Sequence, residues 1–189
     1  METYFEDKKF ENINFTGKEL EKGEYEFCSF VNCDFSDSDI SKITFLECKF
    51  IDCNLSMVKL TNTALRNVKF KDCKMQGIDF EDCNEFGLKM SYENCIIDNC
   101  IFYKIKLTNT LFKYSQLKET DFTECDLTNS IFDNCDLTGT IFKNSILEGV
   151  DFKTSYGFTI DPEFNRIKKA KFSIKNISGL LTKYNIEIE

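Results

Sequence analysis

Residues 125–139 read CDLTN SIFDN CDLTG, and one pattern recurs in this stretch every five residues. A large apolar residue, which we call the centre, occupies the third position of each unit, as Leu127 and Phe132 do. A small residue lies two positions before the centre, as Cys125 does. A short fixed period of this kind is typical of solenoid proteins, in which each unit packs on its neighbours.

The same pattern extends over most of the chain in two blocks. Centres run from Phe5 to Phe80 in the first block and from Tyr92 to Phe152 in the second, whose register is displaced by two residues. Residues two apart in an extended backbone point to the same side, so the centre and the small residue before it should face one interior. The other three positions are rich in Asp, Glu, Asn, Lys and Thr, and we expect them to face water. All ten cysteines occupy the small inward position: Cys28, Cys33, Cys48, Cys53, Cys73, Cys83, Cys95, Cys100, Cys125 and Cys135.

The units Cys125–Asn129 and Cys135–Gly139 resemble those of the pentapeptide-repeat family, which read roughly A(D/N)LXX. The similarity covers about 150 of the 189 residues. The resemblance implies an all-β solenoid, a right-handed quadrilateral β-helix in which four units make one square coil of twenty residues. Its C-terminal end would be closed by a short helix and strand.

Residues twenty positions apart should stack in such a coil, and the sequence supports this. Phenylalanines fall in one column and leucines in another, which is the sorting that stacked coils about 4.8 Å apart favour. The two clearest columns are Phe10, Phe30, Phe50 and Phe70, and Leu107, Leu127 and Leu147.

Residues 81–91 interrupt the repeat. This stretch carries two extra residues, and Glu85 stands where a centre would fall. A bulge or short loop in which Gly87 takes an unusual backbone angle is one explanation. A functional projecting loop is the alternative. The segment Cys83–Met90 is similar to the stretch between the blocks of Qnr-type quinolone-resistance proteins, a branch of the same family.

We expect one repeat domain, residues 1–157, followed by a capping segment, residues 158–189. Pro162 fits a turn, residues 178–184 predict a short helix, and residues 186–189 alternate like an edge strand. A coil end exposes apolar columns and strand edges, so it needs a cap. The resemblance implies that this tail also forms a two-fold dimer contact, and the alternative is a monomer capped by its own tail. The expected cap and dimer residues are Leu180, Leu181, Tyr184, Ile186 and Ile188.

The composition argues against catalysis, cofactors and metals. The chain has no histidine, no C-x-x-C pair and no glycine-rich nucleotide-binding motif. We expect the cysteines to be buried packing residues rather than disulfides or metal ligands, and free thiols fit a reducing cytoplasm. No apolar run approaches the roughly 18–20 residues of a membrane span, and the N-terminus lacks the pattern of a secretory signal. We therefore expect a cytoplasmic, non-enzymatic protein.

The net charge of −8 is unevenly distributed along the chain. Residues 119–136 contain six carboxylates and no basic residue. An acidic surface repels nucleic acid and attracts a basic protein partner. We expect a partner-binding acidic face formed by Glu119, Asp121, Glu124, Asp126, Asp133 and Asp136.

These observations leave two functions open. The first is a protein-interaction scaffold whose partner is unrelated to DNA metabolism. The alternative, implied by the resemblance to the Qnr-type branch, is a DNA mimic that docks on DNA gyrase or topoisomerase IV and protects them from quinolones. Neither function requires direct binding of nucleic acid or membrane. The chain lacks the longer projecting loops of Qnr-type proteins from Gram-negative bacteria, which weakens the alternative.

Overall fold

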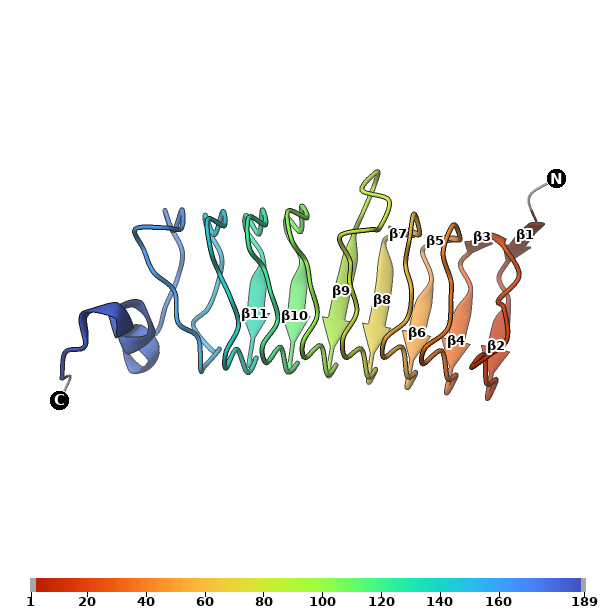
Figure 1. Cartoon of the computed structure of the whole chain (residues 1–189), viewed down its shortest axis with the longest axis horizontal. Coiled ribbons are helices and arrows are strands. Elements are labelled where there is room, and N and C mark those ends of the chain that lie inside the picture. The colour runs from red at the N-terminus through yellow and green to blue at the C-terminus, as the bar shows by residue number, and fades with distance from the viewer. Residues whose placement is uncertain (1–2, 188–189) are drawn as a thin grey trace.

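The computed structural model describes residues 3–187. The backbone winds into a right-handed square β-helix, and its coils stack into a rod (Figure 1). Two parallel sheets run along the rod, in the orders β1-β3-β5-β7 and β11-β10-β9-β8-β6-β4-β2. The strands are β1 Thr3–Glu6, β2 Lys9–Glu11, β3 Gly23–Glu26, β4 Ser29–Val31, β5 Thr44–Leu46, β6 Lys49–Ile51, β7 Ala64–Arg66, β8 Val68–Lys71, β9 Met90–Glu93, β10 Leu111–Lys113 and β11 Ile131–Asp133. Two 3₁₀ helices follow, η1 Ile174–Leu180 and η2 Thr182–Tyr184.

The ladder register confirms the predicted coil of twenty residues. Phe10 pairs with Phe30, and Phe30 pairs with Phe50. The step lengthens at one place, where Phe70 pairs with Tyr92. The two extra residues of the register break are therefore absorbed without interrupting the sheet.

Many corners of the coil are four-residue turns, and the corner at residues 127–130 shows how one is held. The Ser130 N–H donates to the Leu127 carbonyl at 2.9 Å, which closes a four-residue turn. Asn129, the third residue of this turn, has a φ of 58°, a left-handed conformation that Asn, Asp and Gly tolerate best. The Asp126 carboxylate accepts the Thr128 N–H at 3.0 Å. At this corner an acceptor just before the centre and a left-handed residue two positions after it form the turn, and other corners hold Lys104 or Tyr114 in the same left-handed conformation.

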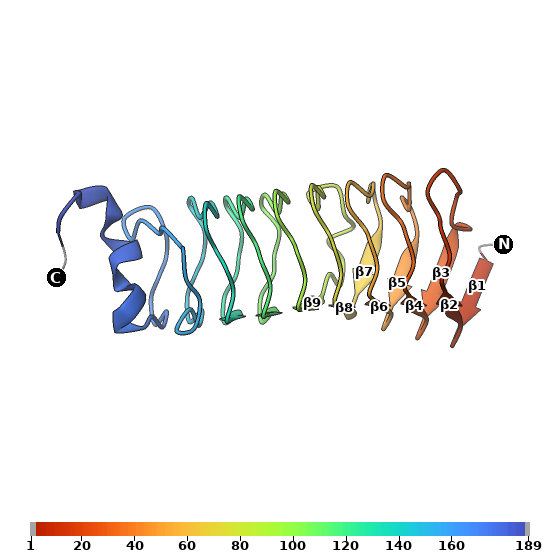
Figure 2. The ribbon, with the colours of Figure 1, turned by 90° about the horizontal axis from the view of Figure 1, so that it is seen from below.

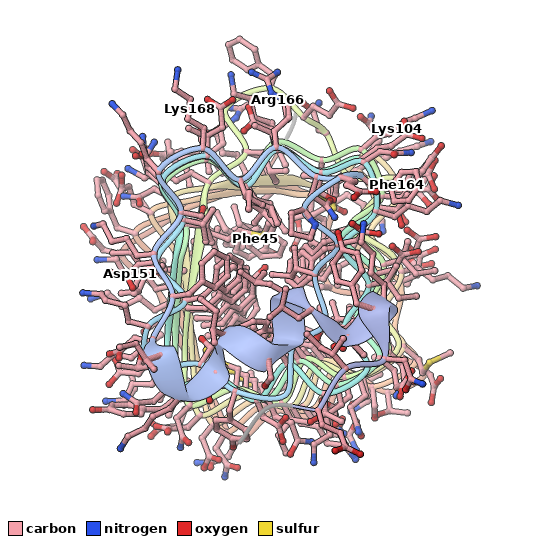
Figure 3. The ribbon with its side chains drawn as sticks, turned by 90° about the vertical axis from the view of Figure 1, so that its left-hand side faces the viewer. Phe45, Lys104, Asp151, Phe164, Arg166 and Lys168 are labelled. Atoms are coloured by element: carbon pink, nitrogen blue, oxygen red, sulfur yellow. The ribbon has the colours of Figure 1, made fainter. Side chains whose placement is uncertain are left out.

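The centres fill the interior in stacked columns, as predicted. One column contains only aromatic rings, and it crosses the register break because Phe70 and Tyr92 stack with ring centroids 5.4 Å apart. Viewed along its axis the rod is square, and Phe45 points inward whereas Arg166 and Lys168 point outward (Figure 3). The rings of the continuous column are Phe10, Phe30, Phe50, Phe70, Tyr92, Phe112, Phe132, Phe152 and Phe172.

The two ends of the rod differ. Strands β1 and β2 form the N-terminal end, whereas η1 and η2 lie across the C-terminal end (Figure 2). The ladder continues into the tail through the pair Asp151 and Lys171, and the division at residue 157 stays a prediction. Residues 185–187 belong to no strand, and the remainder of the alternating stretch lies outside the described residues. No helix within residues 3–187 is long and apolar enough to cross a membrane.

Phe132 offers a direct test of the inward columns. Its ring is fully buried and stacks on Phe112 and Phe152, with centroids 4.7 and 5.1 Å away. Because truncation would leave a cavity between two rings, we expect Phe132→Ala to lower the free energy of unfolding by about 3–5 kcal/mol. Urea unfolding followed by circular dichroism measures this, with Phe164→Ala as the control, since the Phe164 ring is 63% exposed. A loss below about 1 kcal/mol at Phe132 would contradict the inward packing.

Candidate protein-binding surface

Serine and threonine side chains inside the coil donate hydrogen bonds to backbone carbonyls. The Ser130 hydroxyl donates to the Leu107 carbonyl at 2.6 Å, and the Thr140 hydroxyl donates to the Leu117 carbonyl at 2.7 Å. In each case the acceptor lies 23 residues earlier, in the preceding coil. These hydroxyls link neighbouring coils and already have their hydrogen-bond partners. The interior therefore serves stability rather than ligand binding. The same contact recurs at Thr63, Thr120, Ser145 and Ser155.

All ten cysteines are buried, which confirms the inward position expected for them. Burial raises the pKa of the Cys125 and Cys135 thiols to about 12, so both stay neutral near pH 7. The Cys125 thiol also donates to the Phe102 carbonyl at 2.6 Å. Neutral, buried thiols such as these two are poor nucleophiles. A hydrogen bond with Cys73 lowers the pKa of Cys95, but all ten side chains are buried, and we assign the cysteines to packing. Across residues 3–187, no group of three or more His, Cys, Asp or Glu side chains is arranged to hold a metal ion.

The six carboxylates of residues 119–136 are distributed around the rod. Glu119 and Glu124 occupy corners, where both have positive φ angles. The four aspartates belong to four different parallel ladders, one on each side of the coil. The stretch therefore wraps once around the rod, and its role in partner binding stays a prediction. These aspartates are Asp121, Asp126, Asp133 and Asp136.

Three of these aspartates support the corners of the coil. Asp121, Asp126 and Asp136 each accept the N–H of the residue two positions later, at 2.7, 3.0 and 3.1 Å. Lys118 places its ammonium nitrogen 3.3 Å from the Asp136 carboxylate. A local structural role therefore explains much of the acidic pattern.

The register break forms a short loop, residues 85–88, that projects from the rod (Figure 1). Asn84 still belongs to the ladder, and the chain rejoins it where the Lys89 N–H donates to the Leu65 carbonyl at 2.9 Å. Gly87 has a φ of 72°, the unusual backbone angle expected for it. The extra residues are thus displaced outward, and the stack of coils is preserved.

Phe86 is the most prominent side chain of this loop. Its ring is 78% exposed, more than any other aromatic ring within residues 3–187. The Arg66 guanidinium lies 5.4 Å from the ring centroid, and Arg66 Nε donates to the Phe86 carbonyl at 3.4 Å. Sequence reasoning did not single out Phe86, although an aromatic residue outside the centre position is the signal that would have found it.

The predicted cap residues separate into an inner and an outer group. Leu180 packs against the core, and Leu181 is half-buried. Tyr184 and Ile186 are exposed, and Ile188 lies outside the described residues. The inner group closes the coil, whereas a dimer contact through the outer group stays a prediction.

Comparison with protein-family models supports the repeat assignment. A model described as a pentapeptide repeat region matches residues 24–87 and 88–156, which is well over half of the chain. No curated protein matches the chain in sequence.

Solved structures of similar shape include the plasmid-mediated fluoroquinolone resistance protein QnrB1. The full-length QnrB1 structure has a TM-score of 0.63 at 15% identity, over 97% of this chain and 100% of that chain. A trypsin-treated QnrB1 variant has a TM-score of 0.62 at 18% identity, over 100% and 98% of the two chains. HetL, a heterocyst differentiation protein of the cyanobacterium Nostoc, has a TM-score of 0.38 at 12% identity, over 92% and 88%. At these identities, the likeness to QnrB1 shows the fold alone.

The raised thiol pKa values predict low cysteine reactivity in the folded protein. At pH 8 a thiol with a pKa of about 12 is almost entirely neutral, so Cys125 and Cys135 should not react with Ellman's reagent within minutes. All ten thiols should react once the protein is unfolded in guanidinium. Rapid labelling of Cys125 or Cys135 in the folded protein, located by mass spectrometry, would contradict their burial.

The corner role of Asp126 predicts different effects for two substitutions. Asp126→Asn keeps an oxygen that can accept the Thr128 N–H, so we expect the free energy of unfolding to change by less than about 0.5 kcal/mol. Asp126→Ala removes the acceptor and should cost about 0.5–1.5 kcal/mol. Urea unfolding compares the two variants, and equal effects would show that this hydrogen bond does not stabilise the corner.

Proposed function

The chain belongs to the pentapeptide-repeat family, and we propose that it is a non-enzymatic scaffold that binds another protein through its outer surface. The observation that carries this proposal is the Phe86 loop. It presents one exposed aromatic ring on a projection from an otherwise regular rod. Aromatic side chains that become buried on binding are typical anchors of protein interfaces.

The loop is suited to binding because the Phe86 side chain is restrained in the free protein. The contact between Arg66 and the Phe86 ring restrains the side chain before a partner arrives. Restraint of this kind lowers the entropy cost of association. Burial of a phenylalanine ring in a partner pocket would contribute roughly 1.5–3 kcal/mol.

We further propose a homodimer in which the exposed residues of the cap meet across a two-fold axis. Ile174, Tyr184 and Ile186 are 92%, 53% and 56% exposed, and they offer an apolar contact at that end of the rod. Ten free, buried thiols suit a reducing compartment, so we place this activity in the cytoplasm.

The alternative of a DNA mimic at type II topoisomerases receives no specific support from the geometry. Such a mimic requires a continuous acidic face. The carboxylates of residues 119–136 instead lie on four sides, and Lys118 pairs with Asp136. We therefore favour the scaffold with a partner of another kind.

Photo-crosslinking at position 86 tests the proposal. A photoreactive phenylalanine analogue replaces Phe86 in the living host cell, and a matched variant carries it at Phe164, which is also exposed but lies in the C-terminal tail. We expect a discrete protein adduct from position 86 that position 164 does not give, and mass spectrometry identifies the partner. Absence of an adduct at 86, or the same adducts at both positions, would contradict the loop as the anchor. An adduct with a gyrase or topoisomerase IV subunit would instead favour the alternative.

A further inference from the structure

A shallow groove lies on the outer face of the seven-stranded sheet, across β6, β8, β9 and β10. Its volume is about 170 Å³. Apolar surface dominates its lining, and ammonium groups surround it. The residues that matter here are Ser91, Ile51, Leu111, Lys49, Lys69 and Lys71.

A short side chain, Ser91, lies in the outward-facing row of residues that lines the groove. Lys69 pairs with Ser91, and Ser91 pairs with Leu111, in successive strands of the sheet. Side chains at paired positions of neighbouring strands stand next to one another on the same face. The small Ser91 side chain therefore leaves space between Lys69 and the apolar Leu111, and the groove includes this gap.

The charge around this gap is opposite to the charge of the whole protein. Three lysines line the groove, and Glu93 is the single carboxylate that does so. Within the described part of the chain none of these three lysines forms an ion pair, whereas Lys118 and Lys153 pair with neighbouring aspartates. On a protein of net charge −8, this local excess of positive charge favours an anionic group.

The size of the groove restricts its occupant. Small-molecule sites usually measure roughly 300–1,000 Å³, and a volume of about 170 Å³ is enough for one large apolar side chain. The groove opens onto a sheet face, where an extended peptide can lie with its flanking residues near the lysines.

We propose that this groove binds an acidic peptide segment of a partner protein, which inserts one leucine- or phenylalanine-sized side chain between flanking carboxylates. The apolar side chain covers Ser91 and contacts Ile51 and Leu111. The carboxylates face Lys49, Lys69 and Lys71. Apolar contact supplies affinity, and the charges supply orientation and choice of partner.

This inference extends the proposed scaffold function, since it names a ligand class and a second surface. The groove does not include Phe86. Peptide binding and crosslinking at Phe86 can therefore succeed or fail independently of each other.

Fluorescence anisotropy with a synthetic peptide tests the groove. The probe is a fluorescein-labelled peptide in which one leucine is flanked by glutamates. Two control peptides replace the leucine by glycine or the glutamates by lysines. We expect the probe to bind more weakly as salt rises, and both control peptides to bind at least about tenfold more weakly than the probe.

Matched protein variants locate the site. Ser91→Phe fills the groove, whereas Ser29→Phe places the same side chain at the other serine of the row, between Lys9 and Lys49, which does not line the groove. Ser91→Phe should weaken binding about tenfold, and Ser29→Phe should change it less than twofold.

A charge-matched pair of variants keeps the test valid if Ser91→Phe does not fold. Lys69→Gln with Lys71→Gln should weaken binding about tenfold and reduce its salt dependence. Lys59→Gln with Lys143→Gln, which removes two lysines away from the groove, should have little effect. Binding that is equal for the two lysine pairs, equal for the leucine and glycine peptides, or absent up to about 1 mM would overturn the proposal.

Discussion

Each coil of this protein is stable only because its side chains match those of the coils on either side. Phe112 and Phe132 stack with centroids 4.7 Å apart and ring planes within 2°. A smaller residue in such a column would leave a void, and a larger one would force the coils apart. Many inward hydroxyls and thiols add contacts between coils, because they donate to a carbonyl of the preceding coil, as Ser130 does to Leu107. The interior is therefore filled by side chains that pack against those of neighbouring coils.

Because the interior columns must stack, extra residues are placed on the outside of the rod. At the register break, Phe70 stacks on Tyr92 and Phe80 stacks on Phe102, so two columns cross the break intact. The extra residues leave the coil as the Phe86 loop. Strand β9 starts at Met90, just after this loop, and carries Ser91 of the groove. Both candidate binding surfaces thus lie beside the one place where the repeat changes length.

Much of the fold was predictable from the sequence, because the coil repeats a local pattern. The five-residue period predicted a solenoid, the resemblance to the pentapeptide-repeat family implied a square coil of twenty residues, and the phenylalanine column agreed with that coil. The period predicted a corner in each unit but not the conformation of its turn, although Asn129 and Gly139 both stand two positions after a centre and take positive φ angles. The continuity from Phe70 to Tyr92 was also missed, since it depends on where the chain expels the extra residues.

The candidate site was much less predictable. The carboxylates of residues 119–136 are close together in the sequence, but a coil of twenty residues distributes them over four sides of the rod. The groove depends on Ser91 lying between Lys69 and Leu111, which are 22 and 20 residues away in sequence. Contacts of this kind follow from the exact register at the break, which periodicity alone does not reveal.

Amide hydrogen exchange, resolved by residue, tests whether the rod is one continuous body across the register break. If the columns cross the break intact, the amides of Phe70 and Tyr92 should be protected as strongly as those of Phe50 and Phe112. Between β8 and β9, exchange should be fast only in the loop, residues 85–88. A loss of protection that extends through β8 and β9, or separate opening of the two blocks, would contradict a continuous stack and the surfaces built on it.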